Sequence, residues 1–213
     1  SNDRSLMRYK SDYQTENIST HYDWSNWGQF SDAIEMCNNN GACRKLDSGV
    51  MCPSYRVTKE EKDLVRGRAN TLRLALSNQL PEGSFASKEM YETMELCVSC
   101  KACQRECPMS VDMAKMKSEF LSHYYKKFSM RIKDKIISDM PRLIWLYKII
   151  NPIINKIKNL PIISNIIEKF GFATERSLPE VQNQKALRDI YNNQEISENK
   201  VILFADTFNI NFE

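Results

Sequence analysis

The most chemically informative part of the sequence is a run of closely spaced cysteines, Cys97, Cys100, Cys103 and Cys107, followed directly by Pro108. Three thiolates at intervals of three residues can wrap a short loop around one iron–sulfur cubane. The fourth cysteine lies four residues further on, where it begins a new segment, and the proline ends the loop. Zinc sites instead use two pairs of ligands on separate knuckles. The spacing therefore predicts an iron–sulfur cluster rather than zinc.

A second cysteine run lies upstream and ends in the same Cys-Pro pair. It consists of Cys37, Cys43 and Cys52, with Pro53 after the last cysteine and Asn40 at the place where a middle cysteine would stand. When two such runs hold two clusters, the last cysteine of a run binds the cluster of the other run. Exchange of the last cysteines divides the seven thiolates into four and three, with none left over.

This exchange predicts two sites of different kinds. The first is a complete [4Fe–4S] site made of Cys97, Cys100, Cys103 and Cys52. The second has three thiolates, from Cys37, Cys43 and Cys107. Three thiolates suit a [3Fe–4S] cluster, or a [4Fe–4S] cluster with one ligand that is not cysteine. We rank the [3Fe–4S] cluster first, because the amide of Asn40 is a poor ligand for soft iron.

The exchange would also hold the two clusters close together in a fixed orientation, which suits electron relay. Folding should depend on metal, because the ligands gather only when a cluster binds. Basic residues flank both runs, namely Arg44, Lys45, Lys101 and Arg105. Positive charge near an anionic cluster favours its reduced state and raises its potential. Ordinary solvated surface explains these four residues equally well.

Composition narrows the function classes. Seven cysteines cannot form a complete disulfide framework, which favours a reducing, cytoplasmic compartment. A net charge of +3 is too small to indicate binding to nucleic acid, and the glycine-rich loop of dinucleotide sites is missing. Glu60, Glu61 and Asp63 are explained by helix capping and solvent exposure, and His21 and His123 by surface or packing positions. No catalytic residue is assigned, and we expect any substrate site to lie outside this chain.

Three helices should position the cysteines. Thr58 and Glu61 fit a capping box before a helix over Leu64, Val65, Leu72 and Leu76. Gly67 inside that helix costs about 1 kcal/mol relative to alanine. Either a close packing contact requires glycine at this position, or the fold tolerates the defect. Ser87 can cap a second helix, and Asp112 can cap a third. The last two carry apolar side chains on one face, including Met90, Met94, Met113, Met116, Phe120, Leu121 and Tyr124.

The region 126–169 is basic and rich in isoleucine, with ten basic and three acidic residues and a net charge of +7. No apolar run reaches the roughly 18 residues that a membrane-spanning helix needs. We expect short helices broken at Pro152 and Pro161. Two interpretations compete: a surface that touches membrane headgroups, or a connector packed on a partner domain, which we favour. The apolar run 201–205 resembles the first strand of a parallel sheet, as in a fragment of a longer polypeptide, or else a native edge strand.

Several segments carry a family resemblance, namely Asn38–Lys45, Gly49–Tyr55, Arg66–Asn70, Cys107-Pro108 and Val111–Met113. They resemble large bacterial fusion proteins in which an FAD-linked oxidase half precedes an iron–sulfur half, such as D-lactate, glycolate and D-2-hydroxyglutarate dehydrogenases. The paired runs also resemble the helical ferredoxin module of the succinate dehydrogenase iron–sulfur subunit. There, a run spaced like Cys37 and Cys43 serves a three-iron cluster.

The resemblance implies a mainly α fold. It would be an α-helical ferredoxin with two cluster-binding loops, followed by basic connector helices and the first strand of a truncated α/β cysteine-rich domain. The expected divisions are a linker or docking segment over 1–30, the ferredoxin over 31–128, the connector over 129–199, and the start of the truncated domain over 200–213.

The resemblance also implies a function. The clusters would relay electrons from a flavin domain, which oxidises a D-2-hydroxy acid such as D-lactate or D-2-hydroxyglutarate, to a quinone or another carrier. The FAD domain and the cysteine-rich domain would belong to the same or a partner polypeptide, in the cytoplasm or at the inner face of the membrane. The alternative is a cluster-stabilised interaction module without redox turnover.

Overall fold

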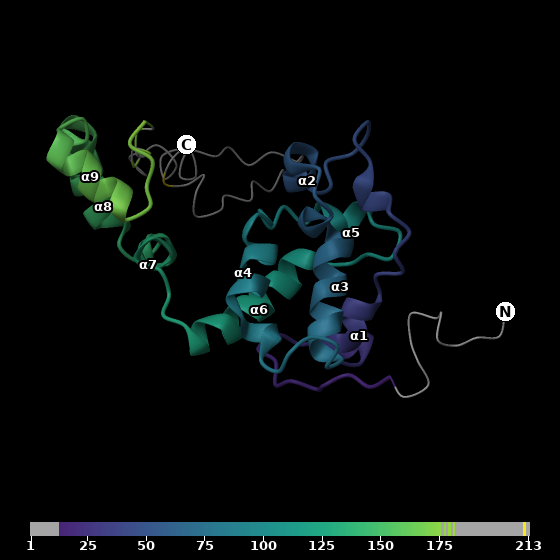
Figure 1. Ribbon diagram of the computed structural model, residues 1–213. Helices are drawn as coiled ribbons and strands as arrows, with labels where there is room; N and C mark the ends of the chain where they lie inside the picture. Colours follow the sequence, from purple (N-terminus) through teal and green to yellow (C-terminus); the bar gives the residue numbers. More distant parts are fainter. Residues whose placement is uncertain (1–12, 176, 178, 180, 182–210, 212–213) are drawn as a thin grey trace, which may run out of the picture. The chain divides into compact units, whose positions relative to one another are not determined.

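The computed structural model describes residues 13–175 together with residues 177, 179, 181 and 211 (Figure 1). Within these residues all regular structure is helical, which confirms the predicted mainly α fold. The strand expected over 201–205 lies outside the described residues. The chain divides into two compact units, Ser1–Ser129 and Met130–Glu213, and each is described by itself. The finer division into four segments stays a prediction.

Unit 1 contains six α-helices among its described residues. They are α1 (Phe30–Glu35), α2 (Pro53–Thr58), α3 (Val65–Leu76), α4 (Lys88–Glu95), α5 (Ala102–Glu106) and α6 (Met113–Lys127). Short 3₁₀ helices lie between them: η2 (Ser25–Trp27), η3 (Ala42–Arg44), η4 (Glu61–Asp63) and η5 (Ser84–Ala86). Helix α3 packs against α1, α4 and α6, so it is the centre of the unit.

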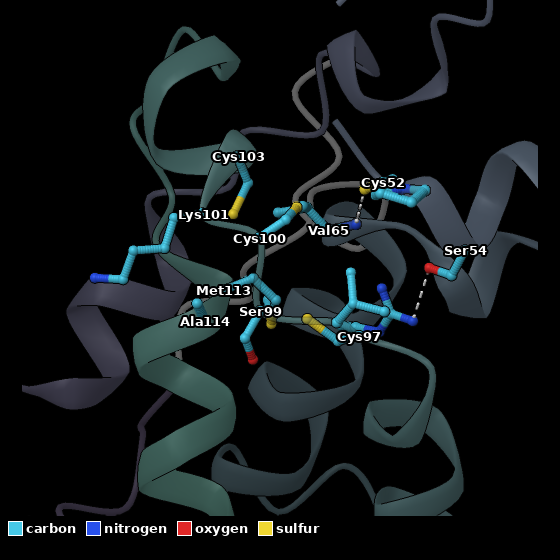
Figure 2. Close-up of a pocket in the computed structure, with 13 residues that line it drawn as sticks. Cys52, Ser54, Val65, Cys97, Ser99, Cys100, Lys101, Cys103, Met113 and Ala114 are labelled. Carbon is cyan, nitrogen blue, oxygen red and sulfur yellow. Dashed lines mark hydrogen bonds between the residues drawn. The ribbon is translucent and has the colours of Figure 1, made fainter. Parts of the chain in front are cut away.

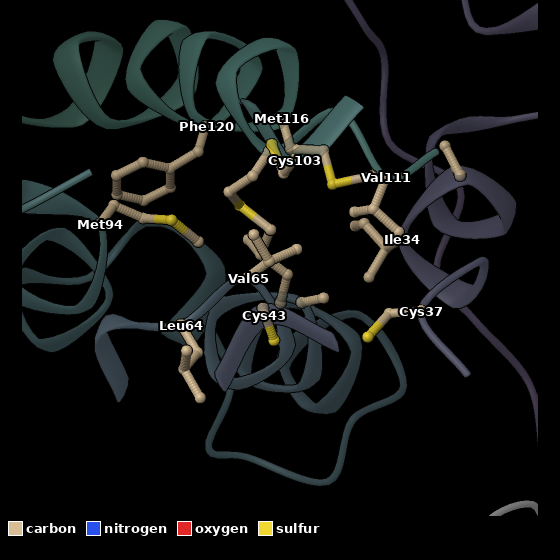
Figure 3. Close-up of a cluster of buried hydrophobic side chains, with 14 of the residues drawn as sticks. Ile34, Cys37, Cys43, Leu64, Val65, Met94, Cys103, Val111, Met116 and Phe120 are labelled. Atoms are coloured by element: carbon tan, nitrogen blue, oxygen red, sulfur yellow. The ribbon is translucent and has the colours of Figure 1, made fainter. Parts of the chain in front are cut away.

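The core of unit 1 joins apolar side chains to cysteines (Figure 3). Met94 of α4 and both Met116 and Phe120 of α6 are fully or almost fully buried, and they face Leu64 and Val65 at the start of α3. The predicted caps of α4 and α6 are confirmed by their hydrogen bonds. The Ser87 hydroxyl accepts from the Met90 amide at 3.2 Å, and the Asp112 carboxylate accepts from the Lys115 amide at 3.0 Å.

The predicted capping box at Thr58 is wrong. Pro53 starts α2 immediately after Cys52, and Thr58 is the last residue of that helix. Lys59 then adopts a left-handed conformation with φ 60°, which ends α2, and α3 begins only at Val65. The Thr58 hydroxyl binds the Asp63 carboxylate at 2.7 Å. Proline preset the first turn of a helix that the apolar spacing alone did not reveal.

Gly67 in α3 is explained by close packing rather than by tolerance of a defect. A Cβ atom at this position would collide with the backbone carbonyl of Glu61 in the 3₁₀ helix η4. Glycine thus lets η4 lie directly on the first turn of α3. This contact positions the start of α3, which borders the cysteine runs.

The segment before α1 is held on α6 by a buried carboxylate. Glu119 is fully buried and accepts hydrogen bonds from the amides of His21 and Tyr22 at 2.9 and 3.0 Å and from the indole of Trp24 at 3.1 Å. Burial raises the pKa of Glu119, but the three donated hydrogen bonds outweigh it and hold the pKa below its ordinary value. The Lys115 ammonium lies 4.1 Å from the centre of the Trp24 ring, so it adds a cation–π contact.

Replacing Glu119 by alanine should therefore release this segment. Three donors would lose their acceptor, and we expect a loss of about 3 kcal/mol in the free energy of unfolding. Urea unfolding of the cluster-loaded protein, followed by tryptophan fluorescence, measures the change. The matched control is Glu82→Ala at an exposed carboxylate. Equal stability of the two variants would contradict the assigned role of Glu119.

Unit 2 contains three helices among its described residues: α7 (Ile132–Asp139), α8 (Ile144–Ile157) and α9 (Pro161–Lys169). The predicted break at Pro161 is correct, since this proline is the first residue of α9. The predicted break at Pro152 is wrong, because α8 continues through it. Pro152 removes the hydrogen bond to the carbonyl of Lys148, but both residues lie on the exposed side of α8. Water can solvate that carbonyl, so the helix survives.

Unit 2 exposes several large apolar side chains, including Trp145, Ile149 and Ile153 of α8 and Ile162 and Ile166 of α9. Lysines share the exposed side of α8, so this surface is both apolar and basic. A segment that touches membrane headgroups and a connector packed on a partner domain would both need such a surface. Across the described residues, none of the helices combines the length and the apolar character needed to cross a bilayer.

Candidate iron–sulfur site

One cavity of unit 1 brings together cysteines from both runs (Figure 2). Cys52 of the first run lines this cavity with Cys97, Cys100 and Cys103 of the second run, whereas Cys107 does not line it. The empty space amounts to about 320 Å³, including the opening to solvent. These four cysteines are the set assigned to the predicted four-thiolate site. Cys97 and Cys100 lie in the loop between α4 and α5, and Cys103 lies in the first turn of α5.

The arrangement of the cysteines around the cavity suits a cluster of several iron atoms better than a single metal ion. Within the ranges that the structure describes, no three side chains of cysteine, histidine, aspartate or glutamate form a group that could hold a metal ion. In a cluster each thiolate binds its own iron, so the cysteines stand around the inorganic core and do not converge on one ion. The side chains of Cys52, Cys97, Cys100 and Cys103 point toward the same space from different sides (Figure 2).

An unusual backbone forms the walls of the cavity. Cys52, Ser99 and Lys101 all have left-handed conformations, with φ of 54°, 54° and 57°. Such a conformation costs a residue other than glycine about 1 kcal/mol. Strained positions of this kind concentrate at functional sites, where the surrounding structure holds them. Here Ser99 and Lys101 turn the short loop before α5 so that its cysteines line one cavity.

Two helix N-termini direct backbone amides at the cysteines. The amide of Val65, the first residue of α3, donates to the Cys52 sulfur at 3.3 Å. The amides of Met113 and Ala114 at the start of α6 hydrogen-bond to Cys103 and oppose the rise in its pKa. Because the N-terminus of a helix carries partial positive charge, it stabilises thiolates and anionic clusters. Hydrogen bonds to the sulfurs are also a determinant of cluster potential.

Burial keeps these thiols neutral when no iron is bound. It raises the pKa of Cys52 to about 12, and the nearby thiols of Cys43 and Cys103 raise it further, against the opposing effects of the Val65 amide and the Arg68 guanidinium. Burial likewise raises the pKa of Cys103. Only thiolates bind iron, so cluster assembly must displace protons from these sulfurs. Cys52 lies near cysteines of both predicted sites.

Arg68 of α3 borders the cavity with a buried guanidinium, only 2% exposed. It donates to the carbonyl of Thr93 at 2.9 Å and to the carbonyl of Asp63 at 2.7 Å, and it forms an ion pair of 3.4 Å with the Asp63 carboxylate. The Asp63 carboxylate balances the charge of Arg68, so the arginine acts here mainly by tying α3 to η4 and α4 beside the cavity. Only the basic residues beside the cysteine runs were considered from the sequence, so Arg68 was missed. This residue does belong to the Arg66–Asn70 segment that carried the family resemblance.

The basic residues noted beside the runs are mostly directed to solvent. Arg44, Lys45 and Arg105 are exposed. Lys101 lines the cavity with part of its chain, but its ammonium lies 3.4 Å from the Asp112 carboxylate and its side chain is 60% exposed. Solvent screens their charge, whereas the Arg68 guanidinium is buried beside the cavity, where the Asp63 carboxylate pairs with it.

The other cysteines of the first run lie around the start of the same helix α3. Cys37 and Cys43 are buried, and burial raises the pKa of Cys43, with Cys37 as a further cause and the Arg66 amide opposing it. Cys107 is half-buried at the end of α5. Its place beside Cys37 and Cys43 stays a prediction.

Asn40, at the position of the missing cysteine, has a local role. Its amide nitrogen donates to the Asn38 side chain at 2.6 Å, and its oxygen accepts from the Ala42 amide at 2.8 Å. The side chain thus shapes the loop between Cys37 and Cys43.

The carboxylates and histidines considered for catalysis take part in ordinary structural contacts. Glu60 pairs with Lys62 at 2.9 Å and Glu61 with Arg66 at 2.6 Å. The predicted solvent exposure of Asp63 is wrong, because this carboxylate is fully buried and pairs with Arg68. His123 packs edge-on against the ring of Phe85, with its centroid 5.4 Å away, and His21 lies beside His123. None of these groups borders the cysteine cavity.

Comparison with known families decides the nature of this segment. Residues 33–111, which include all seven cysteines, match the family of the 4Fe-4S dicluster domain. This segment is an iron–sulfur domain. The match agrees with the cavity, since a dicluster domain needs two sets of thiolates from two runs.

Curated relatives extend the comparison beyond the domain. D-2-hydroxyglutarate dehydrogenase of Pseudomonas putida is 27% identical over 146 residues, which cover 54% of this chain and 14% of the relative. The enzyme of the same name from Escherichia coli K12 is 26% identical over 176 residues, or 66% of this chain and 17% of the relative. The one from Haemophilus influenzae is 27% identical over 137 residues, or 49% and 13%.

The chain thus spans less than a fifth of the length of these relatives. No solved structure matches it significantly. The domain match and the relatives together confirm the resemblance stated from the motifs, that of an iron–sulfur segment of the kind found in D-2-hydroxyacid dehydrogenases. They also support an electron-transfer role for the segment.

Proposed function

We propose that this chain holds two iron–sulfur clusters and passes electrons between them. The four-thiolate site consists of Cys52, Cys97, Cys100 and Cys103 and would hold a [4Fe–4S] cluster. The three-thiolate site consists of Cys37, Cys43 and Cys107 and would hold a [3Fe–4S] cluster, with a [4Fe–4S] cluster as the alternative. The cavity that unites Cys52 with the second run is the observation that carries the proposal.

When bound, the clusters supply one-electron redox chemistry, and the chain's own residues provide its setting. The thiolates hold the iron, and the start of α3 directs the Val65 amide at the Cys52 sulfur. The buried Arg68 lies beside the cavity and, through its ion pair with Asp63, fixes the wall of the cavity at the start of α3. Cys100 is exposed, so one edge of the four-thiolate site reaches the surface, where an electron can enter or leave.

The whole protein, in this proposal, oxidises a D-2-hydroxy acid at a flavin and sends the electrons through these clusters. The relatives named D-2-hydroxyglutarate dehydrogenase support D-2-hydroxyglutarate as the substrate, ahead of D-lactate. FAD and the substrate would bind in a dehydrogenase domain, and a cysteine-rich domain would complete the protein. The final acceptor would be a quinone or another carrier, reached in the cytoplasm or at the inner membrane face.

A cluster-stabilised interaction module is the second candidate. Its support is the apolar and basic surface of α8 and α9 in unit 2, which could dock a partner domain or a membrane surface. In that case the clusters would only stabilise the fold, and two redox-active sites would not be needed.

Iron analysis with a redox titration tests the proposal. Protein prepared or reconstituted without oxygen should contain about seven iron atoms per chain, four for one site and three for the other. Electron paramagnetic resonance during the titration should show reversible reduction of both clusters. Clusters that do not reduce reversibly would favour the interaction module. Protein without iron, or with zinc, would contradict both candidates.

A further inference from the structure

Glu106 belongs to the second cysteine run, yet its carboxylate binds the loop of the first. It is the last residue of α5, one position before Cys107. The amide of Val50 donates to its two oxygens at 2.9 and 3.1 Å, and the amide of Met51 donates to one of them at 3.1 Å. These two amides directly precede Cys52. The contact therefore joins segments that lie 55 and 56 residues apart in sequence.

Gly49 completes the binding site for this carboxylate. Its φ of +71° is a conformation that favours glycine, and a Cβ atom here would fall within the Glu106 carboxylate. Arg56 holds the same loop from α2 by donating to the carbonyls of Gly49 at 2.6 Å and Ser48 at 2.8 Å. The loop before Cys52 is thus shaped to receive one carboxylate.

A carboxylate at the position of Glu106 is electrostatically unfavourable unless hydrogen bonds such as these stabilise it. Thiolate-bound clusters are anionic, and a carboxylate next to Cys107 is repelled by them. Hydrogen bonds from amides to a carboxylate are charge-assisted and are about twice as strong as neutral ones. They offset the repulsion and fix the geometry of Val50 and Met51.

Helix α5 carries both a proposed ligand and the group that holds the loop. Cys103 lies in α5 and lines the cavity, and Glu106 lies three residues further along the same short helix. The position of Cys52 is thereby set relative to Cys103. Without this contact, Arg56 would still hold the loop at Ser48 and Gly49, but Val50 and Met51 would lose the bond that ties them to α5, and Cys52 itself would keep the Val65 hydrogen bond and the start of α2.

We infer that Glu106 is the positioning residue that holds Cys52 of the first run at the cavity of the second run. This inference rests on the proposed exchange of ligands. Its consequence is specific: loss of Glu106 weakens the four-thiolate site at the iron bound by Cys52, while the loop of Cys97, Cys100 and Cys103 keeps the rest of the cluster.

The test uses cluster-loaded protein and mild oxidation with ferricyanide. In Glu106→Ala, the four-thiolate cluster should lose one iron about tenfold faster than wild type, because two charge-assisted hydrogen bonds are lost. The readout is the growth of three-iron paramagnetic signal above the signal that the three-thiolate site gives before oxidation. Glu106→Gln keeps an acceptor oxygen and should restore most of the wild-type resistance. Glu92→Ala, at an exposed carboxylate of α4, is the matched control and should behave like wild type.

Gly49→Ala offers a second, independent variant. Its Cβ would displace the carboxylate, so it should accelerate iron loss as Glu106→Ala does. In the double variant the two effects should not add, because both changes break one contact. Additive effects would contradict a shared role.

Two outcomes would overturn the inference. In the first, Glu106→Ala loses iron at the wild-type rate. In the second, it weakens both clusters equally and lowers the urea midpoint, as a merely structural residue would. Wild-type protein without any four-iron cluster would remove the proposed function together with the inference. A wild type with both clusters and an unaffected Glu106→Ala variant would remove the inference alone.

Discussion

Cys52→Ser should damage the cluster of the second run, although Cys52 belongs to the first run by sequence. Cys52 lines the same cavity as Cys97, Cys100 and Cys103, and it is the first run's only cysteine there. A serine oxygen is a harder and weaker ligand for iron than a thiolate. We expect the four-thiolate cluster to lose one iron and to add a second three-iron signal in electron paramagnetic resonance to that of the three-thiolate site, with the total iron falling by about one atom per chain.

Cys107→Ser is the matched variant for this prediction, because Cys107 also precedes a proline but does not line the cavity. It should leave the four-iron signal intact and diminish the signal of the site with Cys37 and Cys43. Mössbauer spectra of iron-57-loaded protein distinguish the two sites independently. The prediction is contradicted if Cys52→Ser alters only the site with Cys37 and Cys43. It is likewise contradicted if Cys107→Ser alters only the site with Cys97, Cys100 and Cys103.

Removal of both clusters should unfold most of unit 1. Four of the cysteines, Cys37, Cys43, Cys52 and Cys103, are part of its hydrophobic core. The binding free energy of structural zinc in small domains reaches about 10 kcal/mol or more, which is comparable to the whole stability of a typical domain. If the clusters contribute similarly, unit 1 has little stability without them.

Chelation with a reductant present, followed by circular dichroism and limited proteolysis, measures this dependence. The helical signal should fall by about half or more, since the helices packed on the cysteines are lost, and protease should cut within residues 31–128. Anaerobic addition of iron and sulfide should restore both properties. Apoprotein that keeps its helical signal and unfolds in one cooperative transition would contradict the prediction.

The grouping of Cys52 with the second run could be inferred from sequence because ligand chemistry depends on spacing, and its role as an iron ligand stays a prediction. Counting thiolates and exchanging the last of each run placed Cys52 with the second run, and the structure brings these cysteines to one cavity. The caps at Ser87 and Asp112 were also predictable, because a cap binds an amide only three residues ahead. The spacing within a cysteine run and the reach of a cap both involve residues that are close together in the sequence.

The remaining features depend on contacts that local patterns do not encode. Thr58 lies in a good capping sequence, but Pro53 had already started a helix that ends there. Pro152 stays inside α8 because its side of the helix is exposed. Glu119 and Glu106 resemble surface carboxylates in sequence, yet they accept amides from segments more than 50 residues away. Long-range partners of this kind become visible only once the chain is folded.

The most direct measurement is a crystal structure of protein prepared without oxygen, with anomalous scattering recorded at the iron edge. The account predicts two separate groups of iron. Cys52 should bind the group that is also held by Cys97, Cys100 and Cys103, and Cys107 should bind the group held by Cys37 and Cys43. Iron that joins Cys52 to Cys37 and Cys43 in one site, or a single tetrahedral metal ion in the cavity, would contradict it.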